Sequence, residues 1–182
     1  VSNAGVVASD VTGVGTARNN LAACEYGGDK GIFGFGWTGT VQSVTNLVSN
    51  AGVVATDTTG VGTGRYSLAA CGYGYDKGIF GYGDGPVSMT NLVSNSGVVA
   101  SDVTGVGTAR GSLAATQYGG DKGIFGFGGD SSLTNLVSNV GVVATDVTGV
   151  GTARQSLAAT EYGEDKGIFG FGYDGSALSM TN

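Results

Sequence analysis

Few side chains in this sequence could take part in catalysis. The 182 residues include no histidine, which excludes the usual Ser/His/Asp and Cys/His systems and the common zinc sites. The pair that remains for acid and base chemistry is Glu25 and Glu161, which hold equivalent places in the first and last of four repeats. Two carboxylates could serve glycoside hydrolysis, although exposed surface acids are the simpler interpretation.

A second candidate group consists of charged residues that recur in every repeat. Each repeat carries a segment that begins with Asp and ends with Arg, and an Asp-Lys pair follows it. These charges cancel, which favours turn caps and ion pairs that hold the structure together over a charged ligand ring. The segment supplies too few oxygen ligands for a calcium loop, so we expect no metal and no cofactor. The recurring residues of this segment are Arg18, Arg65, Arg110, Arg154, Asp10, Asp57, Asp102 and Asp146.

The two cysteines, Cys24 and Cys71, occupy the same place in the first two repeats, where threonines stand in the last two. A disulfide needs Cα atoms within about 7 Å, and equivalent positions of neighbouring repeats are normally farther apart. We expect two small, buried, free thiols.

The net charge of −6 comes entirely from six acids outside the recurring framework. No basic patch is present, so nucleic acid is not an expected partner. No apolar run approaches the roughly 18 residues of a transmembrane helix, and no signal peptide is visible. We therefore expect neither a membrane span nor nucleic-acid binding.

The elements that would position any site come from an internal repeat. The octapeptide Asp-Lys-Gly-Ile-Phe-Gly-Phe-Gly at 29–36 returns three more times, once with Tyr in place of the second Phe. Four copies predict a repeat architecture in a single domain over 1–182. The repeats cover 1–47, 48–92, 93–136 and 137–182.

Each repeat offers four strand candidates, which in the first complete set are 20–26, 30–36, 44–50 and 52–56. No window has the periodicity of an amphipathic helix. Four-stranded units of about 44–47 residues with glycine-marked turns predict an all-β fold, a β-propeller of four antiparallel blades. Strand alternation predicts that Ile32, Gly34 and Gly36 share one face and that Phe33 and Phe35 share the other. The glycine face then leaves room for an aromatic ring of the adjoining blade.

The repeat resembles the kelch repeat along the whole chain. The likeness lies in the order Thr-Ala-Arg, a strand of small residues, Tyr-Gly-x-Asp-Lys, the glycine-rich second strand and Asn-Leu-Val. The resemblance implies a kelch-like propeller. The repeats are also loosely similar to repetitive proteins of marine phages and environmental sequences, which implies a phage or surface structural component.

Two ways of closing the ring are open. The repeats begin in the middle of a unit, so segments 179–182 and 1–3 would join in one strand register if the ring closes on itself. The small inner strand favours a narrow axis and hence a monomer of four blades. The alternative is a homodimer in which two chains form a ring of eight blades.

The residues that differ between repeats are the best candidates for function. They fall between the second and third strands and directly after the recurring Arg, which an antiparallel blade brings to one face. Aromatic rings beside amides and carboxylates suit a glycan or protein ligand, although drift in unconstrained loops would give the same pattern. We expect a non-catalytic recognition scaffold, with a carbohydrate-active enzyme that uses acids near the ring axis as the alternative. The candidate ligand-binding residues are Trp37, Tyr66, Tyr173, Asn19, Gln155, Asp84, Asp130 and Asp174.

Overall fold

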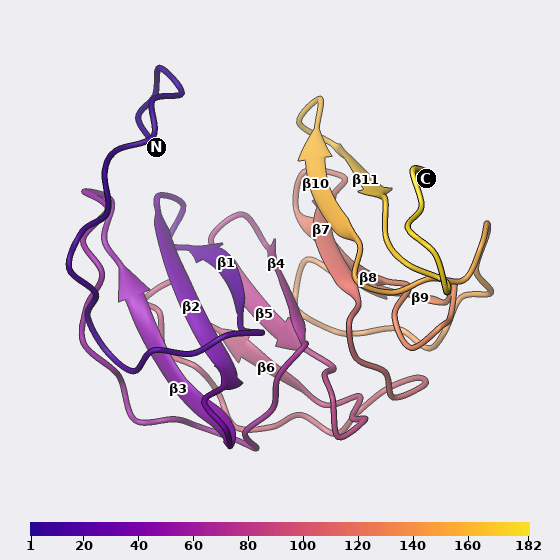
Figure 1. Cartoon of the computed structure of the whole chain (residues 1–182), viewed down its shortest axis with the longest axis horizontal. Helices are drawn as coiled ribbons and strands as arrows, with labels where there is room; N and C mark the ends of the chain where they lie inside the picture. Colours follow the sequence, from indigo (N-terminus) through magenta and orange to yellow (C-terminus); the bar gives the residue numbers. More distant parts are fainter.

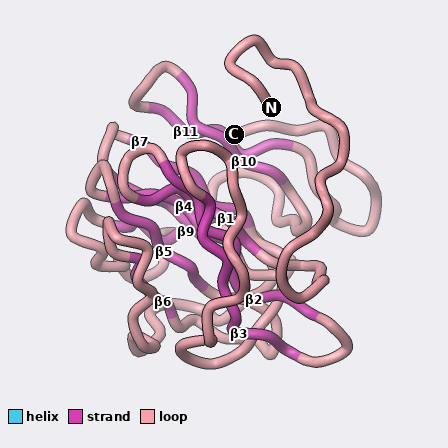
Figure 2. The backbone as a smooth tube through the Cα atoms, turned by 90° about the vertical axis from the view of Figure 1, so that its left-hand side faces the viewer, coloured by secondary structure: helices cyan, strands magenta, loops and turns pink.

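The computed structural model describes all residues, Val1–Asn182, and it confirms the all-β prediction. Four small antiparallel sheets are joined by turns and loops, and none closes into a barrel (Figure 2). The structure contains no helix that could span a membrane. The sheets are β1 (Ala22–Tyr26), β2 (Lys30–Trp37) and β3 (Val41–Val48); β4 (Ala69–Tyr73), β5 (Lys77–Gly81) and β6 (Thr90–Val93); β7 (Ala114–Tyr118), β8 (Lys122–Gly126) and β9 (Thr134–Val137); and β10 (Ala158–Tyr162) with β11 (Lys166–Gly170).

The prediction of four regular strands in each unit is wrong, because three of the sheets have three strands and the fourth has two. The segment after β3 pairs with it only through isolated bridges, at Val54 and Thr58. Between the hydrogen bonds of Ala55 to Leu47 and of Thr58 to Thr45, this outer segment advances three residues while β3 advances two. The extra residue forms a bulge, which interrupts the ladder and redirects the side chains within it.

The bulge has a structural role because it turns Asp57 inward. The Asp57 carboxylate accepts hydrogen bonds from Asn46 Nδ2 at 2.8 Å and from Thr16 Oγ1 at 2.6 Å. Thr16 lies in the segment that leads to β1, so the carboxylate ties that segment to the outer edge of the same sheet. Asp102 and Asp146 make the same contacts in the second and third sheets.

The predicted faces of β2 are also wrong at one residue. Phe35 has a φ of +63°, and the register between β2 and β3 shifts between Gly34 and Gly36. This left-handed residue breaks the alternation of side chains. Phe35 therefore packs in the same buried cluster as Ile32, whereas Phe33 is 39% exposed on the other face.

The prediction that the glycine face receives an aromatic ring of the next sheet is confirmed. A Cβ atom built on Gly34 would lie 2.8 Å from Cζ of Phe80, which reaches across from β5. The same relation joins Gly81 to Phe125 and Gly126 to Phe169. Each inserted ring also meets the aromatic residue that follows the glycine, with ring centroids 5.1–5.4 Å apart and edges toward faces. Full burial of a phenylalanine side chain contributes about 1.5–3 kcal/mol, so these contacts are a main source of cohesion between sheets.

A buried arginine reinforces each junction between sheets. The Arg65 guanidinium lies 4.1 Å from the ring centroid of Phe35 in the preceding sheet. Its Nε donates to the carbonyl of Tyr82 and its second amino group donates to Asn91 Oδ1 at 2.6 Å, both within its own sheet. Burial lowers the pKa of Arg65 to about 10, and the charge of Asp102 opposes this. The arginines of the last three sheets thus contact the preceding sheet through an aromatic ring. The ion pairs lie within a sheet and not between sheets, and each joins an arginine to the aspartate of the following repeat unit.

The four sheets follow one another in an arc, with the N-terminus at one end and the C-terminus at the other (Figure 1). The first strands β1, β4, β7 and β10 contact one another in that order. The predicted closure of the fourth sheet on the first is not confirmed. Phe33 has no glycine to enter, and a Cβ atom on Gly170 would meet only Thr181 Cγ2, at 3.4 Å.

The glycine contact predicts a large effect of a single added side chain. In Gly81→Val the new Cβ would lie 2.6 Å from Cζ of Phe125, and overpacking of this kind costs about 1–3 kcal/mol. We expect a matching drop in the free energy of unfolding, measured by urea denaturation. The control is Gly13→Val, since nothing lies within 4 Å of a Cβ there. Equal losses in the two variants would contradict the packing contact.

The buried aspartate contacts predict an acid-sensitive stability. Partial burial acts to raise the pKa of Asp102, but hydrogen bonds from Thr63 and Asn91 and the charge of Arg65 outweigh it and hold the pKa below 3.8. The carboxylate therefore stabilises the fold above its unfolded pKa, and this contribution disappears as pH falls through the lower folded value. We expect Asp102→Asn to weaken the fold at neutral pH and to reduce the further loss of stability in acid.

Urea denaturation at a series of pH values from about 7 to 2 checks this expectation. Glu161→Gln is the control, because that exposed carboxylate makes no hydrogen bond. An acid limb of unchanged steepness in Asp102→Asn would show that the hydrogen-bonded carboxylate does not govern the pH dependence.

Candidate binding face

The two variable positions of a repeat meet in space. An isolated antiparallel bridge joins Asn19 to Trp37 in the first sheet and Gln155 to Tyr173 in the fourth. In the second sheet the same bridge joins Tyr66 to Asp84. The loop before each first strand and the loop after each second strand therefore lie at the same edge, as the sequence predicted.

Two of the predicted aromatic residues contact each other across the junction of the first two sheets. The rings of Trp37 and Tyr66 have centroids 5.1 Å apart and planes tilted by 49°. Both side chains are half-buried, so each keeps an accessible surface. Together with Asn19 and Asp84, their bridge partners, they form a continuous strip of aromatic, amide and carboxylate groups, which we call the Trp37 strip.

The other predicted residues lie in the third and fourth sheets. Tyr173, bridged to Gln155, is 48% exposed and forms a second aromatic surface. Asp174 is exposed, and its carboxylate accepts hydrogen bonds from Ser176. Asp130 is exposed and has a φ of +55°. Neither carboxylate hydrogen-bonds to another predicted residue, so the structure brings together the Trp37 strip and the Gln155–Tyr173 pair and leaves these two acids in neighbouring loops.

A shallow polar depression of about 170 Å³ lies beside the variable positions and draws on all four sheets. Its polar side chains belong to the residues that directly follow the variable position before each first strand. A chain of backbone hydrogen bonds connects them from sheet to sheet, each amide donating to the carbonyl of the residue in the preceding sheet at 2.8–2.9 Å. These residues are Asn20, Ser67, Ser112 and Ser156.

Sequence reasoning missed this depression. All four of these residues have a φ between +51° and +55°, a conformation that non-glycine residues adopt only infrequently. The sequence placed Asn20 inside the first strand, but the left-handed residue keeps it out of β1 and turns its amide along the edge. The available signal was a polar residue before Leu-Ala-Ala in every repeat, where a regular strand entering the core would favour an apolar one.

The two acids considered for catalysis, Glu25 and Glu161, lie in different surroundings. Glu25 Oε1 accepts a hydrogen bond from Gln117 Nε2 on β7, above Gly72 of the intervening sheet. Glu161, at the equivalent place on β10, is exposed. No three Cys, Asp or Glu side chains are grouped so that they could hold a metal ion. What this region offers chemically is a carboxylate held by an amide close to the inner strands.

Both cysteines are free thiols that pack against the next sheet. A Cβ built on Gly78 would lie 2.5 Å from Sγ of Cys24, and Gly123 has the same relation to Cys71. Burial raises the pKa of both thiols, that of Cys71 to about 12, and the neighbouring Cys71 contributes to the rise at Cys24. Both remain protonated at neutral pH and act as small apolar groups.

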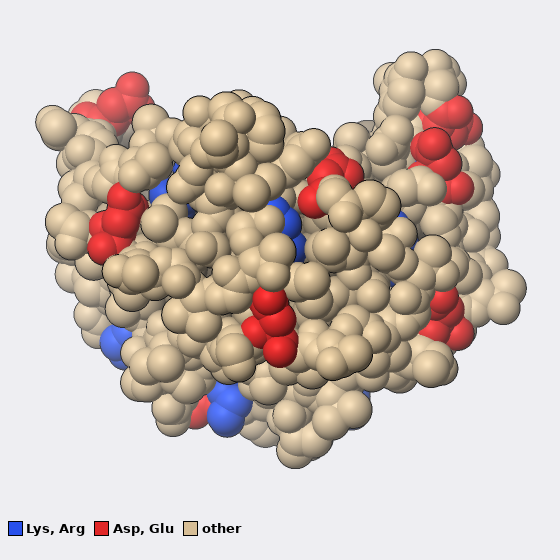
Figure 3. All heavy atoms as spheres, turned by 90° about the horizontal axis from the view of Figure 1, so that it is seen from below, with Lys and Arg blue, Asp and Glu red and all other residues tan.

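The surface charge is dispersed. On the face drawn in Figure 3 the acidic side chains form several separate groups, and basic atoms appear only in small separate areas. The arginines of the repeats are largely withdrawn into the junctions, where three of the four are buried.

A comparison with protein-family models and with curated proteins finds no match for this chain.

Proposed function

We propose that the chain is a non-catalytic recognition module that binds a glycan or a protein through the face formed by the Trp37 strip, the polar depression and the Gln155–Tyr173 pair. The four sheets would be blades of a β-propeller, in keeping with the kelch-like order of the repeat. The stacking of each sheet on the next supports this arrangement. Glu25 is engaged by Gln117, which supports a structural role for that carboxylate.

The contact of Trp37 with Tyr66 carries the proposal. Two accessible rings at one junction present a rigid apolar surface that loses little conformational entropy on binding. Asn19 and Asp84 are joined to the two aromatic residues by backbone bridges, so an amide and a carboxylate lie beside the apolar surface. A sugar has an apolar ring face surrounded by hydroxyl groups and matches this combination. A protein loop with an exposed aromatic or hydroxyl side chain matches it as well.

The closure of the ring is independent of the ligand that this face binds. A four-bladed monomer and an eight-bladed ring of two chains were both predicted from the repeats. The exposed Phe33 and the unfilled Gly170 support the second of these, because the two groups complement each other and lie at opposite ends of the arc.

A glycan array probed with the labelled chain tests the proposed face, followed by titration of each bound glycan. Trp37→Ala and Tyr173→Ala should each weaken binding, and we expect about a tenfold or greater loss for Trp37→Ala, since truncation of an anchoring aromatic residue commonly costs more than 1 kcal/mol. In the native chain the sole tryptophan also reports the event, because a ligand on Trp37 should change its fluorescence.

The matched control is Tyr75→Asn. Tyr75 is 73% exposed in the turn before β5, whereas the variable loop follows β5 at its other end. Its φ of +68° suits asparagine. Unchanged binding in both Trp37→Ala and Tyr173→Ala, or an equal loss in Tyr75→Asn, would reject the face as the binding site.

A further inference from the structure

The first and fourth sheets, at the two ends of the arc, expose different surfaces that complement each other. Phe80, Phe125 and Phe169, which enter the glycine of the preceding sheet, are buried, while the equivalent Phe33 is 39% exposed. On the opposite face, the rings of Phe35, Tyr82 and Phe127 are covered by the next sheet, while the equivalent Phe171 is 61% exposed. The first sheet therefore has an unused projecting ring, and the fourth has an unused receiving surface.

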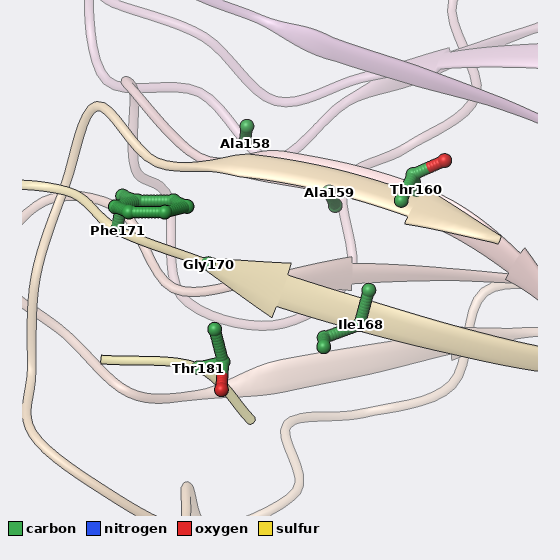
Figure 4. Close-up of a pocket in the computed structure, with 7 residues that line it drawn as sticks. All are labelled: Ala158, Ala159, Thr160, Ile168, Gly170, Phe171 and Thr181. Carbon is green, nitrogen blue, oxygen red and sulfur yellow. The ribbon is translucent and has the colours of Figure 1, made fainter. Parts of the chain in front are cut away.

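The receiving surface is a formed pocket of about 190 Å³ on β10 and β11, shown in Figure 4. Gly170 lies in its lining between Ile168, Phe171 and Thr181. An apolar cavity of roughly 150 Å³ is large enough to hold a benzene ring, so this pocket can hold a phenylalanine side chain. We call this surface the Gly170 end. It is lined by Ala158, Ala159, Thr160, Ile168, Gly170, Phe171 and Thr181.

The opposite surface, the Phe33 end, carries the matching groups. Leu21, Phe33 and Arg18 line a separate shallow pocket there. Their equivalents in the second sheet, Leu68 and Phe80, belong to the buried cluster that joins the first two sheets. Arg18 makes the same hydrogen bonds within its own sheet as Arg65 and Arg110 make in theirs, but, unlike them, it lies over no aromatic ring.

The arginine of the fourth sheet gives an independent sign that this end lacks a neighbour. Arg65 and Arg110 each donate from Nε to the carbonyl of the aromatic residue in their own sheet, at 2.8 and 2.7 Å. The equivalent acceptor for Arg154 is the carbonyl of Phe171, and this bond is absent. Arg154 Nε is the one buried side-chain nitrogen or oxygen without a hydrogen-bond partner. A buried donor without a partner is costly, and it occurs beside the exposed Phe171.

The outer segments show the same incompleteness. Residues 1–11 match the outer segment 48–58 at nine of eleven positions and already form its tight turn, with the Ser2 amide donating to the Val6 carbonyl at 2.8 Å. Residues 7–11, however, are exposed and pair with no strand. In the first three sheets an aspartate of the outer segment accepts hydrogen bonds from a threonine and an asparagine. The equivalent threonine and asparagine of the fourth sheet are Thr152 and Asn182, and the equivalent aspartate is Asp10, near the N-terminus. Asp10 makes no hydrogen bond.

We propose that a second copy of this chain docks head to tail on the Gly170 end and that two copies close an eight-bladed ring. Phe33 of one copy enters the pocket over Gly170 of the other, and Arg18 lies over the ring of Phe171. Residues 1–11 of the first copy complete the outer edge of the other copy's fourth sheet, where Asp10 accepts hydrogen bonds from Thr152 and Asn182. A two-fold axis relates the two copies and repeats this junction on the other side of the ring. Both Phe33 ends and both Gly170 ends are then covered, and the assembly closes.

Light scattering coupled to gel filtration measures the assembly directly. We expect a single species at twice the chain mass of 17.9 kDa. A mass of 17.9 kDa, or one larger than two chains, would overturn the two-chain ring. This mass does not depend on whether the proposed binding face binds a glycan, since no residue of that face lies at the junction between the two copies.

Two variants remove the junction from opposite sides. Phe33→Ala deletes the projecting ring, and we expect the dissociation constant of the dimer to rise by about 100-fold or more, as for a buried phenylalanine truncated at a packed contact. Gly170→Val fills the pocket, and its own chain tolerates the change because only Thr181 Cγ2 lies nearby. Val98→Ala, at an exposed turn of the second sheet, is the control and should stay dimeric.

Mixing the two variants distinguishes a junction from general damage. Phe33→Ala keeps an intact Gly170 end and Gly170→Val keeps an intact Phe33 end, so an equimolar mixture can rebuild one of the two junctions. We expect each variant alone to be monomeric, with circular dichroism like that of the native chain, and the mixture to contain mixed dimers. Dimers that persist in both single variants, or a mixture that remains monomeric, would overturn the proposed contact.

Discussion

The packing of a phenylalanine ring on a glycine of the preceding sheet is the constraint on which the rest of the structure depends. Phe80 comes so close to Gly34 that any side chain there would overlap its ring. Because the rings are rigid and the glycines have no Cβ, the distance and direction between consecutive sheets are set by the same contact three times. The small residues of the first strands follow from it, since Cys24, Cys71 and Thr116 must also fit against glycines of the next sheet.

The buried arginines solve a problem that this close packing creates. The left-handed residues at Tyr82 and Phe127 leave carbonyls pointing into the junctions, and each carbonyl is satisfied by an arginine Nε. Burial of a guanidinium is costly unless its donors are paired. In Arg65 the paired donors, the ring of Phe35 and a carboxylate 3.9 Å away share that task. One side chain thereby links a strand, an outer segment and the preceding sheet.

The sequence allowed the repeat, the strand order in each sheet and the ring-on-glycine contact to be predicted, because these depend on residue size and spacing alone. The position of Phe35 could not be predicted by alternation, since a phenylalanine gives no local sign of a left-handed backbone. The residues that each arginine binds could not be predicted from the sequence either. Arg65 binds Asn91 and pairs with Asp102, far along the chain, and only the outer bulge brings that aspartate inward.

For the candidate site the meeting of Asn19 with Trp37 and of Tyr66 with Asp84 followed from antiparallel pairing. The contact of Trp37 with Tyr66 depends on how two sheets stack and therefore required the structure. The same holds for the depression around Asn20, whose backbone conformation is atypical for its residue type.

The backbone bonds that run from Ser156 to Asn20 have a direction, because every amide points to the sheet before it. Hydrogen bonds in series polarise one another, so the row resembles a line of aligned dipoles with a free donor at the Asn20 amide and a free acceptor at the Ser156 carbonyl. Fraying starts at such free ends, and amide exchange should therefore be fastest there. A row of such hydrogen bonds that closed into a ring would have no free end, so the exchange rates of its amides would differ little.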